Sequence, residues 1–235
     1  GMPNKGNIAL VSQSGAMGTA FLDWIAKRGL GISHFISLGN KINLNENDFL
    51  EFLDQDDNTK VIALYLESIS DGCKFLELAK KVALVKPVII IKGGQTQEAK
   101  IAITSHTGVL AGSFSAQRAA FRQANLIEAE TTEEFFSLIE ICSRYSSDLN
   151  IKDIIVISNA GGPGVLLVDK YAENKVSLAS LSASSKNQLK LILPSASSLN
   201  NPIDILGDAN ENHLEKVLTI LKQFYPQALL QIVLT

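Results

Sequence analysis

Residues 8–18, IALVSQSGAMG, decide the fold of this chain. Uninterrupted apolar residues predict a buried strand at Ile8–Val11, and a turn containing serine and glycine follows it. Beyond the turn, Met17, Phe21 and Trp24 are three or four residues apart, which predicts a helix over residues 15–28. Similar strands and helices alternate along the chain, an order typical of parallel sheets covered on both faces. The fold class is therefore predicted to be α/β and doubly wound.

The predicted elements form two series. Strands are expected at Ile8–Val11, Ile32–Leu38, Val61–Leu66, Val88–Ile91, Leu126–Ala129, Ile154–Ser158, Val176–Ala179 and Leu229–Leu234. Helices are expected at residues 15–28, 46–54, 72–84, 113–124, 131–145, 163–173, 184–192 and 211–223. A polar stretch at 143–150 predicts a boundary between a domain over residues 1–148 and one over residues 149–235. Because Gly1 precedes Met2 and the last strand ends the chain, we expect a fragment whose second domain is truncated.

The turn at residues 12–18 has a copy in the second series. SQSGAMG with Asp23 matches SNAGGPG at residues 158–164 with Asp169, so the pattern S-x-x-G-x-x-G-x-x-x-x-D occurs twice between a strand and a helix. Two domains of one kind are the simplest account. A single such junction would be interpreted as a tight turn with close helix packing. Two in matching positions favour anion binding, because helix N-termini attract anions and glycine lets the backbone approach them. Neither junction fits G-x-G-x-x-G, so no dinucleotide site is predicted.

Composition excludes several classes of protein. The formal net charge is -3 and the sequence pI is about 5.7, without a basic run, so a nucleic-acid partner is not expected. The apolar runs are too short to cross a membrane and no signal peptide opens the chain, so a soluble, cytoplasmic protein is predicted. Cys73 and Cys142 lack paired spacing, which predicts reduced thiols and no metal site.

A glycine-rich loop follows the predicted strand Val88–Ile91 and contains His106 within the sequence SHTG. Open parallel sheets bind ligands beyond the carboxyl ends of their strands, so His106 is expected near the Ser12–Gly15 turn. Glu67 ends Val61–Leu66 at the same edge. Its carboxylate can accept from one imidazole nitrogen and leave the other free to attack; a surface carboxylate that starts a loop is an equally open alternative. The other histidines, His34 and His213, are predicted to be structural or solvated.

This arrangement suits phosphoryl transfer. An imidazole that attacks a phosphoryl group forms a phosphoramidate whose oxygens need donors on several sides. Ser12 and Ser14 offer hydroxyls, and two helix N-termini would each contribute about 1–2 kcal/mol in a partly buried setting. Positioning and charge stabilisation carry most of the rate of such reactions.

Four motifs together resemble one family. GNIALVSQSG at 6–15, SHTG at 105–108, NAGGPG at 159–164 and NPID at 201–204 occur in the order found in ADP-forming acetyl-CoA synthetases, relatives of succinyl-CoA ligase. The resemblance covers nearly the whole chain. It implies two flavodoxin-like domains, of which residues 1–148 carry a phosphohistidine loop. It also implies that His106 is phosphorylated and oriented by Glu67. The phosphate-binding residues that it implies are Ser12, Ser14, Gly15, Gly161, Gly162 and Gly164.

The activity that the resemblance implies is that of an acid–thiol ligase. Acyl-CoA, ADP and phosphate interconvert with a small carboxylic acid, CoA and ATP through an acyl phosphate. The whole enzyme is expected to use CoA, ADP or ATP, and Mg, with no cofactor assigned to this part. It also needs CoA-binding and ATP-grasp domains or subunits, which are absent from these residues, so the chain alone is expected to be inactive. The acyl group, ADP versus GDP, and a homo-oligomeric state are left open.

Two other interpretations of the sequence remain open. The same domains occur in ligand-sensing regulatory modules of protein acetyltransferases, often with the histidine replaced, and His106 beside Glu67 favours catalysis over that role. A flavodoxin-like module that binds FMN or a small anion would share the helix-end phosphate site, but would give His106 no function.

Overall fold

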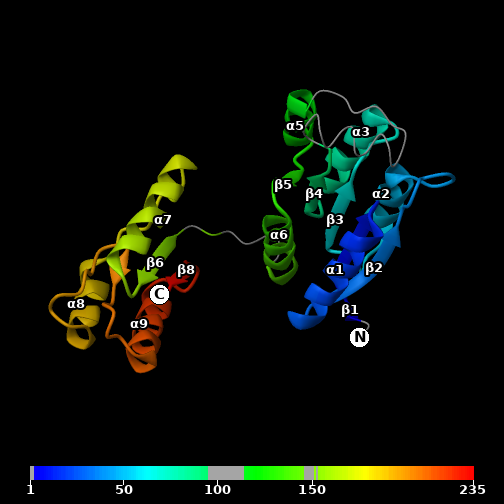
Figure 1. Cartoon of the computed structure of the whole chain (residues 1–235). Coiled ribbons are helices and arrows are strands. Elements are labelled where there is room, and N and C mark those ends of the chain that lie inside the picture. Colours follow the sequence, from blue (N-terminus) through cyan, green and yellow to red (C-terminus); the bar gives the residue numbers. More distant parts are fainter. Residues whose placement is uncertain (1–2, 95–113, 146–150, 152) are drawn as a thin grey trace. The chain divides into compact units, whose positions relative to one another are not determined.

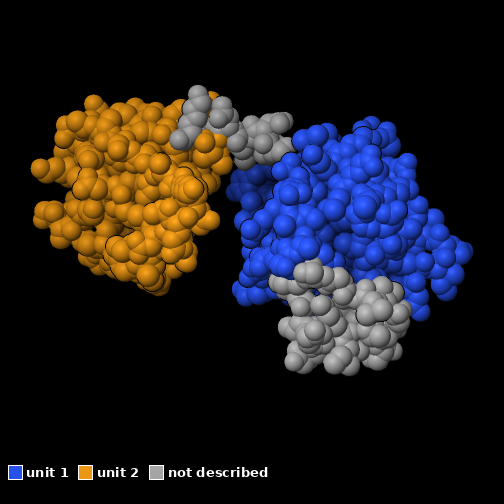
Figure 2. Space-filling view, turned by 90° about the horizontal axis from the view of Figure 1, so that it is seen from above, with its two compact units in different colours: residues 1–148 blue, residues 149–235 orange. Residues whose placement is uncertain are grey.

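The computed structural model of the chain describes residues 3–94, 114–145, 151 and 153–235. These residues belong to two units, Gly1–Asp148 and Leu149–Thr235, which Figure 2 colours blue and orange. No helix among the described residues is long and apolar enough to span a membrane.

Unit 1 is built on a sheet of parallel strands. Its elements are β1 (Asn4–Ser12), α1 (Gly15–Lys27), β2 (Gly31–Ser37), α2 (Glu46–Gln55), β3 (Val61–Leu66), α3 (Gly72–Ala83), β4 (Val88–Lys92), α5 (Phe114–Gln123), β5 (Ile127–Ala129) and α6 (Thr132–Arg144) (Figure 1). The strand order is β2-β1-β3-β4-β5, and every neighbouring pair is parallel. This is the flavodoxin-like doubly wound order, so the predicted fold class is confirmed.

Helices cover both faces of this sheet (Figure 1). On one face, Leu50 of α2, Phe75 of α3 and Phe121 of α5 join the buried residues of the strands. On the other face, Phe21 of α1 and Phe135 of α6 do the same. Each fully buried phenylalanine contributes about 1.5–3 kcal/mol to the free energy of unfolding. The two cores therefore fix the strand ends from which the candidate site is built.

Unit 2 has a smaller parallel sheet. Its elements are β6 (Ile154–Ser158), α7 (Gly161–Glu173), α8 (Ala183–Ile192), β7 (Ile203–Asp204), α9 (Glu211–Phe224) and β8 (Leu229–Val233). The strand order is β7-β6-β8. Its core joins β6 to α8 and α9 through residues that include Ile155, Leu189, Val217 and Leu221.

The predicted strand at Val176–Ala179 is wrong. In that segment, the N–H of Ala179 donates to the carbonyl of Ile154 (3.0 Å), but no strand forms. The place beside β6 belongs to β7, where Ile203 pairs with Ile157. Beside the start of β6, the side chain of Asn201 supplies contacts in place of a strand: its Nδ2 donates to the carbonyls of Ile154 (2.7 Å) and Ala179 (2.9 Å).

Candidate functional site

The Ser12–Gly15 turn joins β1 to the N-terminus of α1. Ser12 is buried, and its Oγ donates to the carbonyl of Ser14 (2.8 Å) and accepts from the Ser14 N–H (3.1 Å). Its hydroxyl therefore holds the shape of the turn. Ser14 is the N-cap of α1, and its Oγ accepts from the Met17 N–H (3.2 Å). These contacts satisfy one of the free N–H groups with which every helix begins.

The corresponding turn in unit 2 repeats this construction. The buried Ser158 Oγ donates to the carbonyl of Ala160 (2.6 Å) and accepts from the Ala160 N–H (3.2 Å). Ala160 is the N-cap of α7, and it has no side-chain oxygen to accept from the first turn. Among the described residues, the main-chain donors at the start of α7 therefore have fewer side-chain partners than those of α1.

The glycines of the two turns differ in how much space a side chain would find at each position. A Cβ on Gly18 would lie 2.7 Å from the ring of Phe35, which would have to move, whereas a Cβ on Gly164 would make an ordinary packing contact of 3.4 Å with the Cβ of Ser158. Gly15 and Gly162 differ, because a Cβ on either would meet no heavy atom of the described residues within 4 Å. Neither has a left-handed φ. Packing and backbone conformation in the described structure thus leave room at both helix N-termini.

The likeness of the two turns extends to the neighbouring strand. Ser12 is in register with Tyr65 on β3, and Ser158 with Val233 on β8. The Gln13 N–H donates to the Tyr65 carbonyl (3.0 Å), just as the N–H of Asn159 donates to that of Val233 (3.3 Å). The repeat seen in the sequence is therefore also a structural repeat.

Glu67 lies directly after β3, at the edge that also holds the Ser12–Gly15 turn. Its N–H donates to Oε1 of Gln13 (2.7 Å), so Gln13 connects the turn to Glu67. The half-buried carboxylate accepts from the Tyr65 hydroxyl (3.5 Å). Burial, and secondly the charge of Glu67, raise the pKa of Tyr65 above its usual value of 10.0. Gly93, at the end of β4, lies close to both side chains: a Cβ there would be 3.4 Å from Cγ of Glu67.

His106 lies outside the described residues, in the segment 95–113 that follows Gly94 in the sequence. The two other histidines have structural contacts, as predicted. Nδ1 of His34 lies 3.4 Å from a carboxylate oxygen of Asp56. His213 forms a capping box at the start of α9, where its N–H donates to Oδ1 of Asn210 (3.1 Å).

Comparison with known proteins identifies the family. A family model described as succinyl-CoA ligase like flavodoxin domain matches residues 5–142. The chain belongs to this family.

Two relatives of this ligase-like chain are named as ADP-forming acetate–CoA ligases. It is 45% identical over 94% of its length to acetate–CoA ligase [ADP-forming] I of Archaeoglobus fulgidus, and 37% identical over 93% of its length to the alpha subunit of acetate–CoA ligase [ADP-forming] II of Pyrococcus furiosus. The chain spans only 32% of the first relative and 48% of the second.

A solved structure is also similar. It is that of the Ca. Korarchaeum cryptofilum dinucleotide forming acetyl-coenzyme A synthetase 1 in complex with phosphate and ADP. The two proteins share 35% sequence identity with a TM-score of 0.88, over 98% of this chain and 50% of that one.

Sequence reasoning missed three polar residues of this ligase-like site, namely Gln13, Lys41 and Lys92. Nζ of Lys92 donates to the carbonyls of Glu67 (2.6 Å) and Gly93 (2.7 Å). A lysine at the end of an apolar strand was the available signal for Lys92. Gln13 and Lys41 contact residues that are distant in the sequence, and no local pattern marks such contacts.

Among the residues that the structure describes, no three His, Cys, Asp or Glu side chains are grouped so that they could hold a metal ion.

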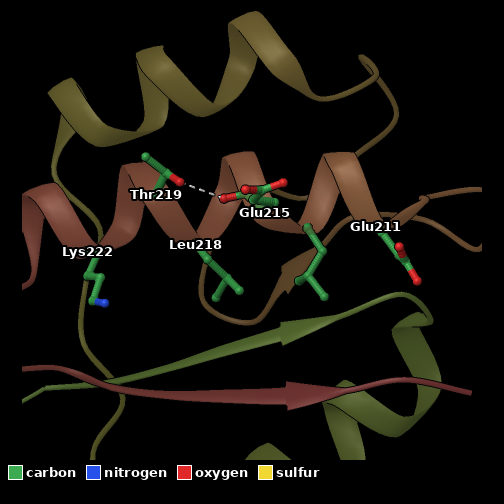
Figure 3. A pocket seen from close by; sticks show the side chains of 6 residues that line it. Glu211, Glu215, Leu218, Thr219 and Lys222 are labelled. Carbon is green, nitrogen blue, oxygen red and sulfur yellow. Dashed lines mark hydrogen bonds between the residues drawn. The ribbon is translucent and has the colours of Figure 1, made fainter.

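A shallow groove runs along one face of α9 in unit 2 (Figure 3). It is lined by Glu211, Leu214, Glu215, Leu218, Thr219 and Lys222, none of which is a predicted site residue.

Proposed function

We propose that this chain is the phosphoryl-relay part of a nucleoside-diphosphate-forming acyl-CoA synthetase, in which His106 carries the phosphoryl group between an acyl phosphate and ADP. The observation that carries the proposal is the connection through Gln13, which joins the α1 N-terminus to Glu67 at one edge of the sheet. β4 ends at this edge, and the segment that contains His106 follows it in the sequence, after Gly94. The names of the relatives, acetate–CoA ligases that form ADP, support the same reaction class.

The proposed roles follow from the chemistry of a phosphohistidine. One nitrogen of His106 attacks the phosphoryl group while Glu67 accepts a hydrogen bond from the other, which keeps the attacking nitrogen free and stabilises the positive charge that develops on the ring. The N-terminus of α1, shaped by Ser12, Ser14 and Gly15, binds the phosphate oxygens. The start of α7, with Gly161, Gly162 and Gly164, serves a second phosphate position.

The other reactants belong to parts of the enzyme beyond this chain. CoA, the nucleotide and Mg²⁺ would be held by CoA-binding and ATP-grasp domains or subunits, and the substrates would be a small carboxylic acid and phosphate. The phosphate fits this chain, because main-chain donors and open space occur together at Gly15 and Gly162. The described residues offer no cluster for a metal, so no step is assigned to Mg²⁺ here. The free thiols of Cys73 and Cys142 suit a reducing compartment such as the cytoplasm.

The test is to detect the phosphohistidine. The chain is assayed with its CoA-binding and ATP-grasp parts, and the enzyme is incubated with labelled ATP or with acyl-CoA and labelled phosphate. Mass spectrometry should locate an acid-labile phosphoryl group on His106, and His106→Ala should abolish it. The sequence contains three histidines, so His34→Gln and His213→Gln are matched controls that should keep the label.

The outcomes separate the possible functions. A label that survives His106→Ala would refute the relay. A wild-type protein that takes up no label, yet binds an acyl-CoA or a nucleotide, would favour the ligand-sensing role. Yellow protein with flavin absorbance would favour an FMN-binding module. The chain without its missing parts is expected to form neither ATP nor phosphohistidine.

A further inference from the structure

The two residues of the Glu67–Ser68 turn are held by side chains at all four main-chain polar groups. Oε1 of Gln13 accepts from the N–H groups of Glu67 (2.7 Å) and Ser68 (2.9 Å). Nζ of Lys92 donates to the Glu67 carbonyl (2.6 Å), and Nζ of Lys41 donates to the Ser68 carbonyl (2.7 Å). In most surface turns, water supplies some of these partners. Here, the protein determines the direction in which the main chain leaves β3.

Lys41 reaches this turn from the loop between β2 and α2. Its Nζ lies 2.6 Å from Oε2 of Glu46, and both side chains are buried, with exposed fractions of 6% and 0%. Burial lowers the pKa of Lys41, while its hydrogen bond to Glu46 and then the charges of Glu46 and Glu67 act in the opposite direction. Oε1 of Glu46 accepts in turn from the Ser70 N–H (2.5 Å). The ion pair therefore holds the main chain at the Ser68 carbonyl and, two residues further on, at the Ser70 N–H.

A contribution to stability alone explains this pair poorly. Removing two charges from water costs several kcal/mol per ion, and hydrophobic replacements of buried ion pairs are often equally stable. What such a replacement cannot supply is a set of directed hydrogen bonds to Ser68 and Ser70. Gln13 links this set to the α1 N-terminus because it lies in the Ser12–Gly15 turn, directly before the N-cap Ser14. Its Nε2 also donates to Oγ of Ser68 (3.2 Å).

We propose that Gln13, Lys41 and Glu46 are positioning residues that act through Glu67. They fix the turn that carries the Glu67 carboxylate relative to the N-terminus of α1, and so set the direction from which Glu67 meets the imidazole of His106. This inference rests on the proposed phosphoryl relay. A misplacement of about 1 Å in such a site can cost about 100-fold in rate, so the loss should appear in the chemical step.

The first test is a double-mutant cycle in the complete enzyme. Gln13→Met keeps the length of the side chain and removes both its acceptor and its donor. It should lower kcat by about 10- to 100-fold and change the KM for acyl-CoA by less than about twofold. Glu67→Gln should lower kcat by about 100-fold or more. In the Glu67→Gln background, adding Gln13→Met should cost less than about threefold, because the group it positions is already lost.

The second test separates positioning by the ion pair from its effect on stability. Lys41→Met alone leaves a buried, unpaired Glu46 and should lower the melting temperature. The double variant Lys41→Met/Glu46→Leu should regain most of that stability and still show the loss in kcat. Lys86→Met is the matched control, because Lys86 is another buried lysine that donates to main-chain carbonyls, but it precedes β4 at the opposite edge of the sheet. It should lower stability and leave kcat unchanged.

The outcomes distinguish this inference from the function on which it rests. Suppose that the wild-type enzyme forms a phosphohistidine at His106, but Gln13→Met lowers kcat equally in the wild-type and Glu67→Gln backgrounds, or not at all. The positioning roles are then refuted and the phosphoryl relay is not. Full activity of Lys41→Met/Glu46→Leu would also refute the role of the pair. If the wild-type enzyme forms no phosphohistidine, the relay and the positioning roles are both refuted.

Discussion

Replacing Lys86 by methionine should destabilise unit 1 although Lys86 lies far from the candidate site in the sheet. The Nζ of Lys86 donates to the carbonyls of Leu53 (2.6 Å), Asp54 (3.0 Å) and Asp56 (2.8 Å) at the C-terminal end of α2. The last carbonyls of a helix have no partner within the helix, and a cation is favourable at this end of the dipole. Met keeps most of the apolar stem and removes the ammonium group.

The expected loss is about 3 kcal/mol. Hydrogen bonds from a charged donor contribute about 1.5–3 kcal/mol each, so three of them set an upper bound well above this value. The bound is reduced because Met avoids the cost of burying the ammonium group, which is several kcal/mol. For a unit of this size, about 3 kcal/mol corresponds to a fall of roughly 6–12 °C in Tm.

Urea denaturation followed by tryptophan fluorescence would measure this loss. Trp24 is the single tryptophan of the sequence, and its ring stacks on Phe136 at 4.9 Å, so its emission reports unit 1. Lys81→Met is the matched control. Lys81 of α3 pairs with Asp54 of α2 (2.7 Å), but its side chain is 65% exposed, so its loss should move the urea midpoint much less than the loss of Lys86. Equal urea midpoints for Lys86→Met and Lys81→Met would refute the reasoning.

Three further predictions follow from other contacts. The pKa of Asp56 is lowered from 3.8 to about 2, mainly by a hydrogen bond from a threonine hydroxyl. The ionised Asp56 should therefore stabilise the fold fully above pH 4 and lose this effect as the pH falls towards 2. In urea denaturation, the difference in stability between the wild type and Asp56→Asn should shrink over that range. Ser12→Ala should lower the free energy of unfolding measured by Trp24 fluorescence by about 1–3 kcal/mol. Ser158→Ala should leave that value unchanged and lower the midpoint of the unfolding transition of unit 2 seen by far-UV circular dichroism. Glu67→Gln should lower the raised pKa of Tyr65 in a spectrophotometric titration, because a neutral amide no longer disfavours the phenolate; an unchanged pKa would contradict the contact.

Most of the fold could be predicted because it follows local patterns. Runs such as Val61–Leu66 are buried along nearly their whole length, so their apolar character is visible in the sequence. The failure at β7 has a physical reason, because a strand of two residues, Ile203–Asp204, is too short to show a period. The apolar segment Val176–Ala179 had the composition of a strand, but its place beside β6 was taken by Asn201 and β7.

The candidate site was predictable only in part, and for a related reason. The spacing of Ser12, Gly15 and Gly18 is local, so the turn could be recognised from the sequence. The residues that hold Glu67 are not local to it: Gln13 is 54 positions away, and Lys41 is 27 positions from Ser68. Lys41 also has a φ of 55°, an unusual conformation for lysine that no sequence pattern announced. Such contacts form between residues that come together only when the sheet has folded, so a local sequence pattern does not reveal them.

The differences between the two repeated turns indicate where the chemistry lies. Main-chain groups are common to both: the turn held by a buried serine, the register with the next strand and the helix N-terminus recur in unit 2. Oδ1 of Asn159 accepts from the N–H of Thr235 (3.0 Å), just as Gln13 accepts from that of Glu67, so Thr235 stands where unit 1 has a carboxylate. A threonine can donate to a phosphate but cannot stabilise an imidazolium as a carboxylate does. Under the proposed relay, we therefore expect both units to bind phosphate and, of the two corresponding turns in the described residues, the one in unit 1 to supply the carboxylate that activates the histidine.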